Sequence, residues 1–342
     1  MSQLTVAVDA GDLARDPRGL GRYARALVRE LAQRDDISLV LVVDALLSTL
    51  VRKTFEALLK SDRFSLARRI PRSANVAWHP WNRLTLRASL PHVVTIADVA
   101  PFRFPHPDPH RREHQQAPFH RAARHAARII TLSHASAADI QAYLGAPPER
   151  IAVTYPGVDP VFHPRVENGS LPAERPYFLF VGNVHEERKN FHVLYEAFRR
   201  TWGANKGPAL LVAGPTDPEL PGVEHRAVDD ARLAALYANA LATCVPARYE
   251  GFGLPAIESM ACGTPVLASN VSALPEACSD AAVLLAPDDV AAWSFAMERA
   301  ATQPSLRAEF ASRGLQRAAE FRWERCAQQT LEILSQAAYN IP

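Results

Sequence analysis

Short apolar runs alternate with amphipathic stretches along most of the chain. This alternation limits the folds that the chain can adopt. In the first half, the runs expected to form strands are residues 5–9, 38–44, 75–78, 92–97, 128–132 and 151–155. The stretches expected to form helices between them are residues 21–33, 46–59, 120–127 and 135–144. Strands that alternate with helices in this way form a parallel sheet covered by the helices. The first half therefore predicts a Rossmann-like α/β domain.

A second alternation follows a segment of different composition. Residues 156–176 are rich in Pro, Gly, Asn and Glu, a composition typical of a linker between domains. Beyond the linker, the expected strands are residues 177–181, 209–213, 241–245, 265–268 and 282–285, and the expected helices are 191–201, 231–238, 255–261, 290–302 and 306–317. We therefore expect an α/β protein with two Rossmann-like domains, residues 1–165 and 166–321, and a last helix within residues 322–342.

Composition fits two ordinary domains and limits the classes of function. The 342 residues are 48% hydrophobic, enough for two cores, and the net charge of +2 gives no reason to expect a nucleic-acid partner. The four cysteines have no metal-ligand or disulfide spacing, which is typical of free thiols in a reducing compartment. We find no signal region and no apolar stretch long enough for a bilayer, so we expect a cytoplasmic protein.

One basic segment suggests a peripheral contact with a membrane. Residues 51–73 combine Lys and Arg with Phe and Leu. A basic amphipathic segment can lie on anionic lipid, here at the inner face of the cytoplasmic membrane. An ordinary surface helix and loop would carry the same residue types, so both interpretations stay open.

Residues 250–258 read E-G-F-G-L-P-A-I-E and contain the most informative motif of the chain. Pro255 suits the first turn of a helix, and Gly263 is placed to end that helix. An apolar strand, a glycine loop and a helix N-terminus together bind anions, because backbone amides and the helix dipole point at the ligand. The amides expected to hold a diphosphate belong to Gly251, Phe252, Gly253 and Leu254.

A carboxylate lies at each end of this motif, and the two together limit the class of ligand further. Glu250 and Glu258 would repel a phosphate, but they can accept hydrogen bonds from sugar and ribose hydroxyls. The loop therefore predicts a nucleotide-sugar site. For Glu258 alone, the alternative is an acid favoured in the first helical turn by the dipole, worth about 0.3–1 kcal/mol.

A pair of cations follows the first strand of the second domain. Arg188 and Lys189 lie beyond residues 177–181, where the carboxyl end of a parallel strand faces the ligand crevice. There they can form charge-assisted hydrogen bonds with diphosphate oxygens. Because His185 and two glutamates lie beside them, a solvated charge cluster is the alternative.

A second glycine motif opens an alternative function. Residues 19–24 read G-L-G-R-Y-A and fit the dinucleotide fingerprint G-x-G-x-x-A, with Asp44 near the position of a ribose-binding acid. An NAD-dependent Rossmann enzyme is therefore an alternative. The fingerprint requires its first glycine directly after the strand, whereas residues 10–18 intervene here, which counts against this alternative.

Taken in order, the motifs resemble those of retaining glycosyltransferases of the GT-B fold, family 4, of a short bacterial mannosyltransferase-like type. The resemblance covers most of the chain. Its motifs are G-L-G-R-Y at 19–23, T-L-S-H-A-S-A-A-D-I at 131–140, Y-P-G-V-D at 155–159, V-G-N-V-H-E-E-R-K-N at 181–190, E-x7-E at 250–258 and G-T-P-V at 263–266. It implies two Rossmann-like domains that face a cleft and a C-terminal helix, residues 322–342, that crosses back to the first domain.

The resemblance also implies a role for each candidate residue. Arg188 and Lys189 would neutralise the departing nucleoside diphosphate, while Glu250 would contact the donor sugar and Glu258 the ribose. The cleft-lining residues opposite the donor would be Gly19 and Gly21. The implied reaction moves a hexose, with mannose favoured, from a nucleoside-diphosphate sugar to a saccharide or glycolipid acceptor in cell-surface polysaccharide synthesis. No D-x-D pair is present, so we expect neither a metal nor a cofactor.

Two positions depart from the family pattern. Ala97 stands where the family has a histidine before Asp98, and Asn183 stands where many members have an arginine. These departures suggest a second alternative, a catalytically silent homologue that serves as a binding or partner subunit. His79 could replace the missing histidine from a neighbouring strand end, although packing in the core is the simpler role.

The region 106–125 holds a group of histidines that could suggest a metal site. They are His106, His110, His114, His120 and His125. Their spacing matches no zinc motif, and arginines lie between them. We therefore expect a solvated basic face.

Overall fold

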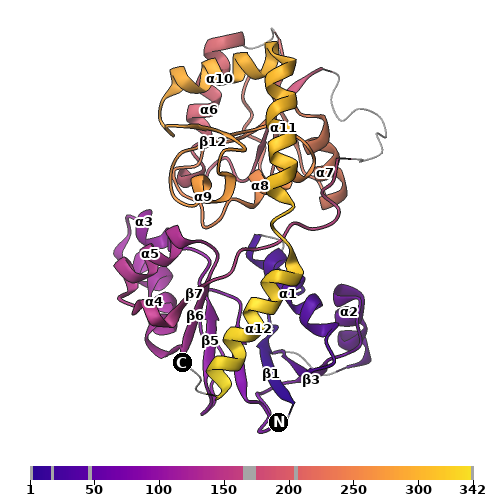
Figure 1. The fold of residues 1–342 in the computed structure, drawn as a ribbon. Coiled ribbons are helices and arrows are strands. Elements are labelled where there is room, and N and C mark those ends of the chain that lie inside the picture. Colours follow the sequence, from indigo (N-terminus) through magenta and orange to yellow (C-terminus); the bar gives the residue numbers. More distant parts are fainter. Residues whose placement is uncertain (1–2, 17–18, 45–47, 165–174, 204–206, 340–342) are drawn as a thin grey trace. The chain divides into compact units, whose positions relative to one another are not determined.

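The computed structural model describes residues 3–16, 19–44, 48–164, 175–203 and 207–339, which form two compact units (Figure 1). Unit 1 contains Met1–Gly157 together with Arg322–Pro342, and unit 2 contains Val158–Phe321. The expected boundary at residues 165 and 166 lies outside the described residues. The chain passes from one unit to the other between Gly157 and Val158 instead.

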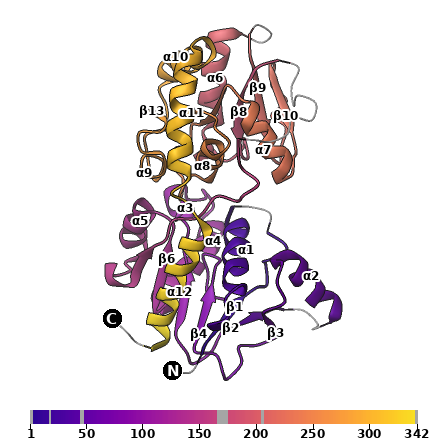
Figure 2. The same cartoon turned by 45° about the vertical axis from the view of Figure 1, so that its right-hand side comes forward.

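Unit 1 contains a seven-stranded parallel sheet with the order β3-β2-β1-β4-β5-β6-β7 (Figure 2). The strands are β1 (Leu4–Asp9), β2 (Ile37–Val42), β3 (Ser65–Ala67), β4 (Val76–His79), β5 (His92–Thr95), β6 (Arg128–Thr131) and β7 (Ile151–Val153). Parallel strands are covered on both faces and so read as continuous apolar runs. Val6 and Val8 in β1 are fully buried, as is Ala7 between them. The alternation thus predicted every strand of this sheet except β3.

The helices of unit 1 agree with the expected pattern at all but two places. They are α1 (Gly19–Ala32), α2 (Thr49–Leu59), α3 (Ala100–Arg103), α4 (Pro109–His125), α5 (His134–Leu144) and α12 (Trp323–Tyr339). Helix α3 was not expected, and α4 begins well before the expected residue 120. The start of α4 is set by Asp108, whose carboxylate accepts hydrogen bonds from the backbone amides of His110 and Arg111. Our prediction missed this stretch because it is mostly exposed, lacks an apolar period and contains Pro118.

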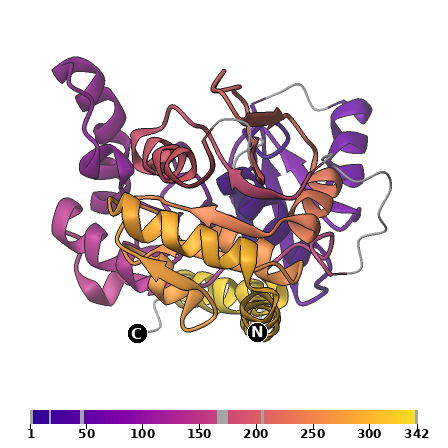
Figure 3. The same ribbon diagram turned by 90° about the horizontal axis from the view of Figure 1, so that it is seen from above.

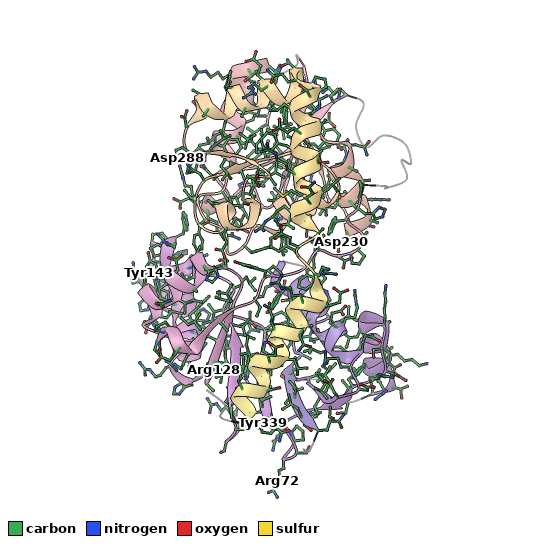
Figure 4. All side chains as sticks on the ribbon, in the orientation of Figure 1. Arg72, Arg128, Tyr143, Asp230, Asp288 and Tyr339 are labelled. Carbon is green, nitrogen blue, oxygen red and sulfur yellow. The ribbon has the colours of Figure 1, made fainter. Side chains whose placement is uncertain are left out.

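The last helix belongs to unit 1, as expected. Helix α12 packs against α1 and against β4, β5 and β6 of the sheet (Figure 1). At its first residue, the ring of Trp323 lies 6.1 Å from that of Tyr23 in α1. Leu334, further along α12, is fully buried. Helix α12 is therefore a core element of the unit that begins the chain, and it ends at Tyr339, labelled in Figure 4.

The basic segment 51–73 does not form a single amphipathic helix. Helix α2 ends at Leu59, Lys60 adopts a left-handed conformation, and β3 follows. Phe55, Leu59 and Phe64 are buried, so their apolar side chains pack inside unit 1. This packing favours the interpretation as a surface helix and loop, and membrane contact stays a prediction. Within the described ranges, no helix combines the length and apolar character required to cross a bilayer.

Unit 2 contains a six-stranded parallel sheet with the order β10-β9-β8-β11-β12-β13. The strands are β8 (Tyr177–Val181), β9 (Ala209–Ala213), β10 (Val223–Arg226), β11 (Ala242–Val245), β12 (Val266–Ser269) and β13 (Val283–Leu285). The helices are α6 (Phe191–Trp202), α7 (Asp230–Asn239), α8 (Leu254–Ala261), α9 (Leu274–Cys278), α10 (Val290–Thr302) and α11 (Pro304–Ala318). Among these described strands and α-helices, β10 and α9 were not expected.

Helices cover both faces of the sheet in unit 2 (Figure 3). Alternate residues of β8 point to opposite faces because the side-chain period of a strand is two. Phe178 and Phe180 join a core cluster with α6 and α10, whereas Tyr177 and Leu179 join one with α7. Both clusters consist mainly of apolar side chains, so the sheet is buried on both faces.

The strand order of unit 2 places a switch point between β8 and β11. From β8 the chain proceeds outward to β9 and β10, and then returns to β11 on the other side of β8. Loops after two such strands leave the sheet in opposite directions, and ligands of open α/β sheets bind in the crevice between them. Arg188 and Lys189 follow β8, and Glu250 follows β11. The predicted donor residues therefore meet at the switch point.

Candidate functional site

The glycine loop after β11 and helix α8 each end at a glycine with a positive φ. Gly253 precedes α8 with φ of +104°, and a Cβ at this position would lie 2.7 Å from Leu274 Cδ2. Only glycine suits both the backbone and the packing there. Pro255 lies in the first turn of α8, and Gly263 follows the helix with φ of +74°. The start and the end of this helix thus agree with the sequence prediction.

Because α8 begins one residue earlier than expected, Glu258 falls just beyond its first turn. The helix begins at Leu254, which places Glu258 in the second turn. The field of the helix dipole acts mainly within the first turn, so it does not account for this acid. Glu258 is 3% exposed and accepts a hydrogen bond from Tyr237 Oη at 3.0 Å.

Three of the candidate residues form one charged cluster. Lys189 Nζ donates to Glu250 Oε1 at 2.6 Å, and Arg188 Nη1 approaches Glu250 Oε2 at 3.4 Å. Arg188 also pairs with Glu186 at 2.8 Å. Glu250 is only 7% exposed. From the sequence we expected the cations and the acid to have separate roles, whereas the structure brings them into direct contact.

The cations determine the ionisation state of Glu250. Burial alone would raise the pKa of its carboxyl group, but the charges and hydrogen bonds of Lys189 and Arg188 outweigh burial and lower that pKa. Glu250 is therefore a carboxylate at neutral pH. It can orient hydroxyl groups as a hydrogen-bond acceptor, while the cations beside it can bind an anion.

A second set of contacts fixes the loop that carries the cations. Asn190 follows Lys189 in a left-handed conformation, with φ of +56°. Its Nδ2 donates to the carbonyl of Pro246 at 3.0 Å and to that of Pro287 at 2.8 Å. These carbonyls lie after β11 and after β13, so Asn190 joins three loops at the carboxyl edge of the sheet. We did not single out Asn190 from the sequence, although asparagine is one of the few residues that tolerates this conformation.

An ion pair supports the same arrangement. Arg248 donates to Asp288 at 2.8 Å, and its backbone amide donates to the carbonyl of Arg188, also at 2.8 Å. Asp288 lies in the loop after β13 and is labelled in Figure 4. We did not predict either residue, because nothing in the local sequence reveals that β11 and β13 end near β8.

The segment 272–276 contributes through Ser272. The backbone amide of Glu250 donates to Ser272 Oγ at 2.9 Å. Ser272 has φ of +51°, an uncommon conformation for this residue type. Helix α9 has no side-chain cap. The hydroxyl therefore fixes the glycine loop and does not cap the helix.

Gly19 and Gly21 lie in unit 1, at the start of α1. Gly19 is exposed. A Cβ at Gly21 would overlap the backbone carbonyl of Asp16, and Arg25 Nη1 donates to that carbonyl at 2.5 Å. Gly21 thus accommodates the loop of its own chain. Because this loop fills the space beside Gly21, the geometry does not match the open fingerprint that the NAD alternative requires.

His79 is buried in unit 1 and packs against a second histidine. Thr85 donates its backbone amide to His79 Nδ1 at 3.4 Å, and His79 Nε2 lies 3.0 Å from His92 Nδ1. His92 Nε2 lies 3.1 Å from the carbonyl of Ala88, which can only accept. A proton on Nε2 of each ring satisfies all three contacts. Burial and then the neighbouring His92 lower the pKa of His79 to about 3, so the ring is neutral.

The histidines of region 106–125 lie in α4 or just before it. Within the part of the chain that the structure describes, no group of three His, Cys, Asp or Glu side chains is arranged to hold a metal ion. His110, His114 and His120 lie on exposed positions of α4.

Two family models match the chain. The model of glycosyltransferase family 4 matches residues 17–162, and the model of glycosyl transferases group 1 matches residues 175–303. The chain is 31% identical over 272 residues to the O-antigen chain mannosyltransferase B of Escherichia coli, and the match covers 71% of each protein. The chain belongs to glycosyltransferase family 4.

A second relative of this family 4 member is matched over a smaller part of its length. The chain is 32% identical over 234 residues to the MMP alpha-(1->4)-mannosyltransferase of Mycolicibacterium hassiacum. This match covers 64% of the chain and 56% of the relative. The chain thus spans a little over half of the length of that mannosyltransferase.

Solved structures show the fold of this family 4 member. The sucrose-phosphate synthase from Thermosynechococcus elongatus aligns with a TM-score of 0.74 at 21% identity, over 97% of this chain and 98% of the other. WaaG, a glycosyltransferase involved in lipopolysaccharide biosynthesis, aligns with a TM-score of 0.71 at 17% identity, over 97% and 100%. The fold is GT-B.

Proposed function

We propose that this protein is a retaining, metal-independent hexosyltransferase. It moves a hexose, with mannose as the favoured sugar, from a nucleoside-diphosphate donor to a saccharide or lipid-linked saccharide acceptor in cell-surface polysaccharide synthesis. The observation that carries this proposal is the cluster of Lys189, Arg188 and Glu250 at the switch point of unit 2.

The cations are suited to stabilise a departing diphosphate. An ammonium has three donors, and one donor of Lys189 is used by Glu250. The other N–H groups of Lys189 and the guanidinium of Arg188 can bind phosphate oxygens. Negative charge on the diphosphate grows as the glycosidic bond breaks, so these contacts strengthen in the transition state and increase the rate.

Backbone amides supply a second set of donors. Pro255 has no N–H, and the amide of Ala256 is bonded to the carbonyl of Gly253. Of the first helical turn, Leu254 is therefore the residue whose amide we assign to the diphosphate, together with the loop amides before it. The start of α8 adds the positive end of the helix dipole.

The environment of Glu250 suits an orienting role better than that of a nucleophile. Its carboxylate is ion-paired and mostly buried, which lowers its reactivity toward an anomeric carbon. In the proposed mechanism the departing phosphate itself accepts the proton of the acceptor hydroxyl on the face from which it leaves. Configuration is then retained without a covalent intermediate on the protein.

The names of the relatives support the choice of substrates. Two relatives at 31% and 32% identity are mannosyltransferases, one of them of an O-antigen chain. A protein of the same fold, HepE from Anabaena, has been solved in complex with UDP-glucose, at 16% identity and a TM-score of 0.71 for that complex. We therefore take GDP-mannose as the first donor to test.

The proposal is tested by donor binding and turnover. Calorimetry with GDP-mannose, UDP-glucose, dTDP-glucose and ADP-glucose is expected to reveal at least one donor, whose hydrolysis or transfer continues in excess EDTA. Glu250→Gln should reduce turnover about 100-fold or more. The matched control is Glu309→Gln, on the exposed surface of α11, which should leave turnover unchanged. Binding of no donor, or loss of activity in EDTA, contradicts the proposal.

A catalytically silent role is the second candidate, and Ala97 is the observation that favours it. The family histidine at this position is absent, while the donor residues of unit 2 are present. Donor binding without hydrolysis or transfer would support this candidate. Ala97→His would then be expected to restore turnover, whereas an active wild-type protein excludes it.

A further inference from the structure

A buried hydrogen bond joins helices α7 and α8 beside the candidate site. Tyr237 Oη donates to Glu258 Oε2 at 3.0 Å. Tyr237 is fully buried and Glu258 is 3% exposed, so water contributes little to solvating either group. A carboxylate in such surroundings is costly unless donors of the protein hold it. The contact is therefore worth more than a surface hydrogen bond between the same groups.

The hydroxyl of Tyr237 is held in place from two sides. Its ring packs against Phe162 with centroids 5.7 Å apart, inside the apolar cluster on the α7 face of the sheet. At the backbone, Thr264 Oγ1 donates to the carbonyl of Tyr237 at 2.6 Å. A side chain anchored at both the ring and the backbone presents its hydroxyl in one position.

The backbone around Glu258 is fixed as well. The next residue, Ser259, donates to Thr243 Oγ1 of β11 at 2.8 Å and is fully buried. Helix α8 therefore cannot rotate without breaking buried polar contacts. The Glu258 side chain still has rotatable bonds of its own, and ordering a glutamate side chain costs about 1.5–2 kcal/mol in general. The hydrogen bond from Tyr237 orders this side chain before any ligand arrives.

The hydroxyl of Tyr237 is a neutral hydrogen-bond donor, and this determines which groups Glu258 can still bind. A carboxylate has about four acceptor positions, and one hydrogen bond from a phenol occupies one of them. Unlike the cations at Glu250, Tyr237 is neutral, so its hydrogen bond does not neutralise the carboxylate. A carboxyl group held in one orientation is suited to accept hydrogen bonds from two adjacent hydroxyls.

We propose that Tyr237 is a positioning residue for the nucleotide, which orients Glu258 toward the 2′- and 3′-hydroxyls of the donor ribose. This inference rests on the proposed function, in which Glu258 binds the ribose. Tyr237 thus contributes to the affinity for the donor ribose without touching the donor.

The test compares Tyr237→Phe with a matched control in the same core. Tyr177 is 2% exposed, and its Oη donates to the carbonyl of Leu236 at 2.8 Å. Tyr177→Phe thus removes a buried hydroxyl from the same cluster while the bond from Tyr237 to Glu258 stays in place. Calorimetry measures the affinities of GDP and of 2′,3′-dideoxy-GDP, and of the uridine pair, for the full chain. Wild-type protein and Tyr177→Phe should prefer the ribonucleotide by the same factor.

We expect Tyr237→Phe to reduce this preference about tenfold and to leave affinity for the dideoxy nucleotide unchanged. The variant should raise donor KM by the same factor with little change in kcat. In the background of Glu258→Gln, the additional effect of Tyr237→Phe should disappear, because both changes act on one contact.

The nucleotide affinities of the wild type test the role of Glu258, and those of the variants test the role of Tyr237. A wild-type protein that binds neither GDP nor UDP, or that does not distinguish ribose from dideoxyribose, contradicts the role of Glu258 and the inference with it. A wild-type protein that does distinguish them, beside a Tyr237→Phe variant with an undiminished preference, overturns the inference alone. Equal weakening of both nucleotides by Tyr237→Phe and Tyr177→Phe assigns Tyr237 a structural role and overturns it as well.

Discussion

Lys189 Nζ lies 2.6 Å from Glu250 Oε1, although 61 positions separate the two residues in the chain. Each residue belongs to a loop on one side of the switch point between β8 and β11. The pair is nearly excluded from water, with side-chain exposures of 13% and 8%. The cation and the acid of the candidate site are therefore electrostatically coupled, so a change to Lys189 alters Glu250 as well.

The coupling predicts a pH-dependent loss of stability in Lys189→Met. Removal of the cation leaves a buried carboxylate with weaker compensation, which destabilises proteins by about 3–5 kcal/mol. In the wild type the pKa of Glu250 is lowered, so the ion pair stabilises the fold above the ordinary carboxyl pKa and loses its effect as pH falls through the folded value. In the variant that pKa rises. Urea unfolding should reveal a deficit that is larger at pH 7 than at pH 4.5.

A double variant provides the control for this prediction. Glu250→Gln in the Lys189→Met background removes the uncompensated charge, so much of the stability should return while turnover stays low. If the double variant lost as much unfolding free energy as the two single variants together, the residues would not be coupled.

Asn190→Gly should impair the site although glycine suits the backbone better. Glycine adopts the left-handed conformation without strain, so the variant isolates the loss of the Nδ2 contacts with Pro246 and Pro287. We expect a loss of about 2 kcal/mol in unfolding free energy and about a tenfold lower kcat. Lys60→Gly is the matched control, because Lys60 is also left-handed, with φ of +51°, and exposed. The control should be neutral or stabilising in denaturant unfolding.

Gly21→Ala should destabilise unit 1 through its own loop. The added methyl group would overlap the carbonyl of Asp16 and displace the loop that Arg25 holds. Overpacking of this kind costs about 1–3 kcal/mol or more. Gly145→Ala is the comparison for backbone strain alone, because Gly145 has φ of +64° and a methyl group added there would meet no atom within 4 Å. A left-handed alanine costs about 1–2 kcal/mol, and Gly21→Ala should lose more than this because its methyl group overlaps a backbone carbonyl. If thermal unfolding finds equal losses in both variants, the loop of residues 10–16 does not pack on Gly21 as described.

The buried histidine pair predicts acid sensitivity. The pKa of His79 falls from 6.5 to about 3 on folding, so the unfolded chain binds a proton between these values while the folded chain does not. Stability should therefore decrease as pH falls below 6.5, by up to about 1.4 kcal/mol per pH unit from this residue. Denaturant unfolding between pH 6.5 and 4.5 measures the slope. His79→Gln should flatten the slope, and His192→Gln, exposed on α6, should not change it.

The fold could be predicted for those elements whose formation depends on the local pattern of apolar residues. Buried parallel strands read as apolar runs, and every run that we expected became a strand. The exceptions have a shared cause. Strand β10 lies at an edge and contains Glu224, His225 and Arg226, so it has no apolar signature. Helix α4 is polar over most of its surface, and Pro118 within it reads as a helix breaker.

The site was predictable as a set of residue types and not as an arrangement. The acids and the cations stood out because glycines and a proline surround the acids and a strand precedes the cations. Their contact depends on the strand order, which local patterns do not encode. Asn190 and Tyr237 escaped notice because their roles arise from partners that lie far along the chain. A tyrosine in an amphipathic helix reads as a core residue until its hydroxyl is seen on Glu258.

The position of α12 has a consequence for the order in which the protein matures. Synthesis completes all residues of unit 2, up to Phe321, before Trp323 of α12 leaves the ribosome. Unit 1 begins the chain, yet its core needs the buried side chains of α12, among them Trp323 and Leu334. The second unit can therefore finish folding first, while the nascent first unit exposes the apolar surface that α12 later covers. Chaperones that recognise such surface should bind the unfinished chain at unit 1.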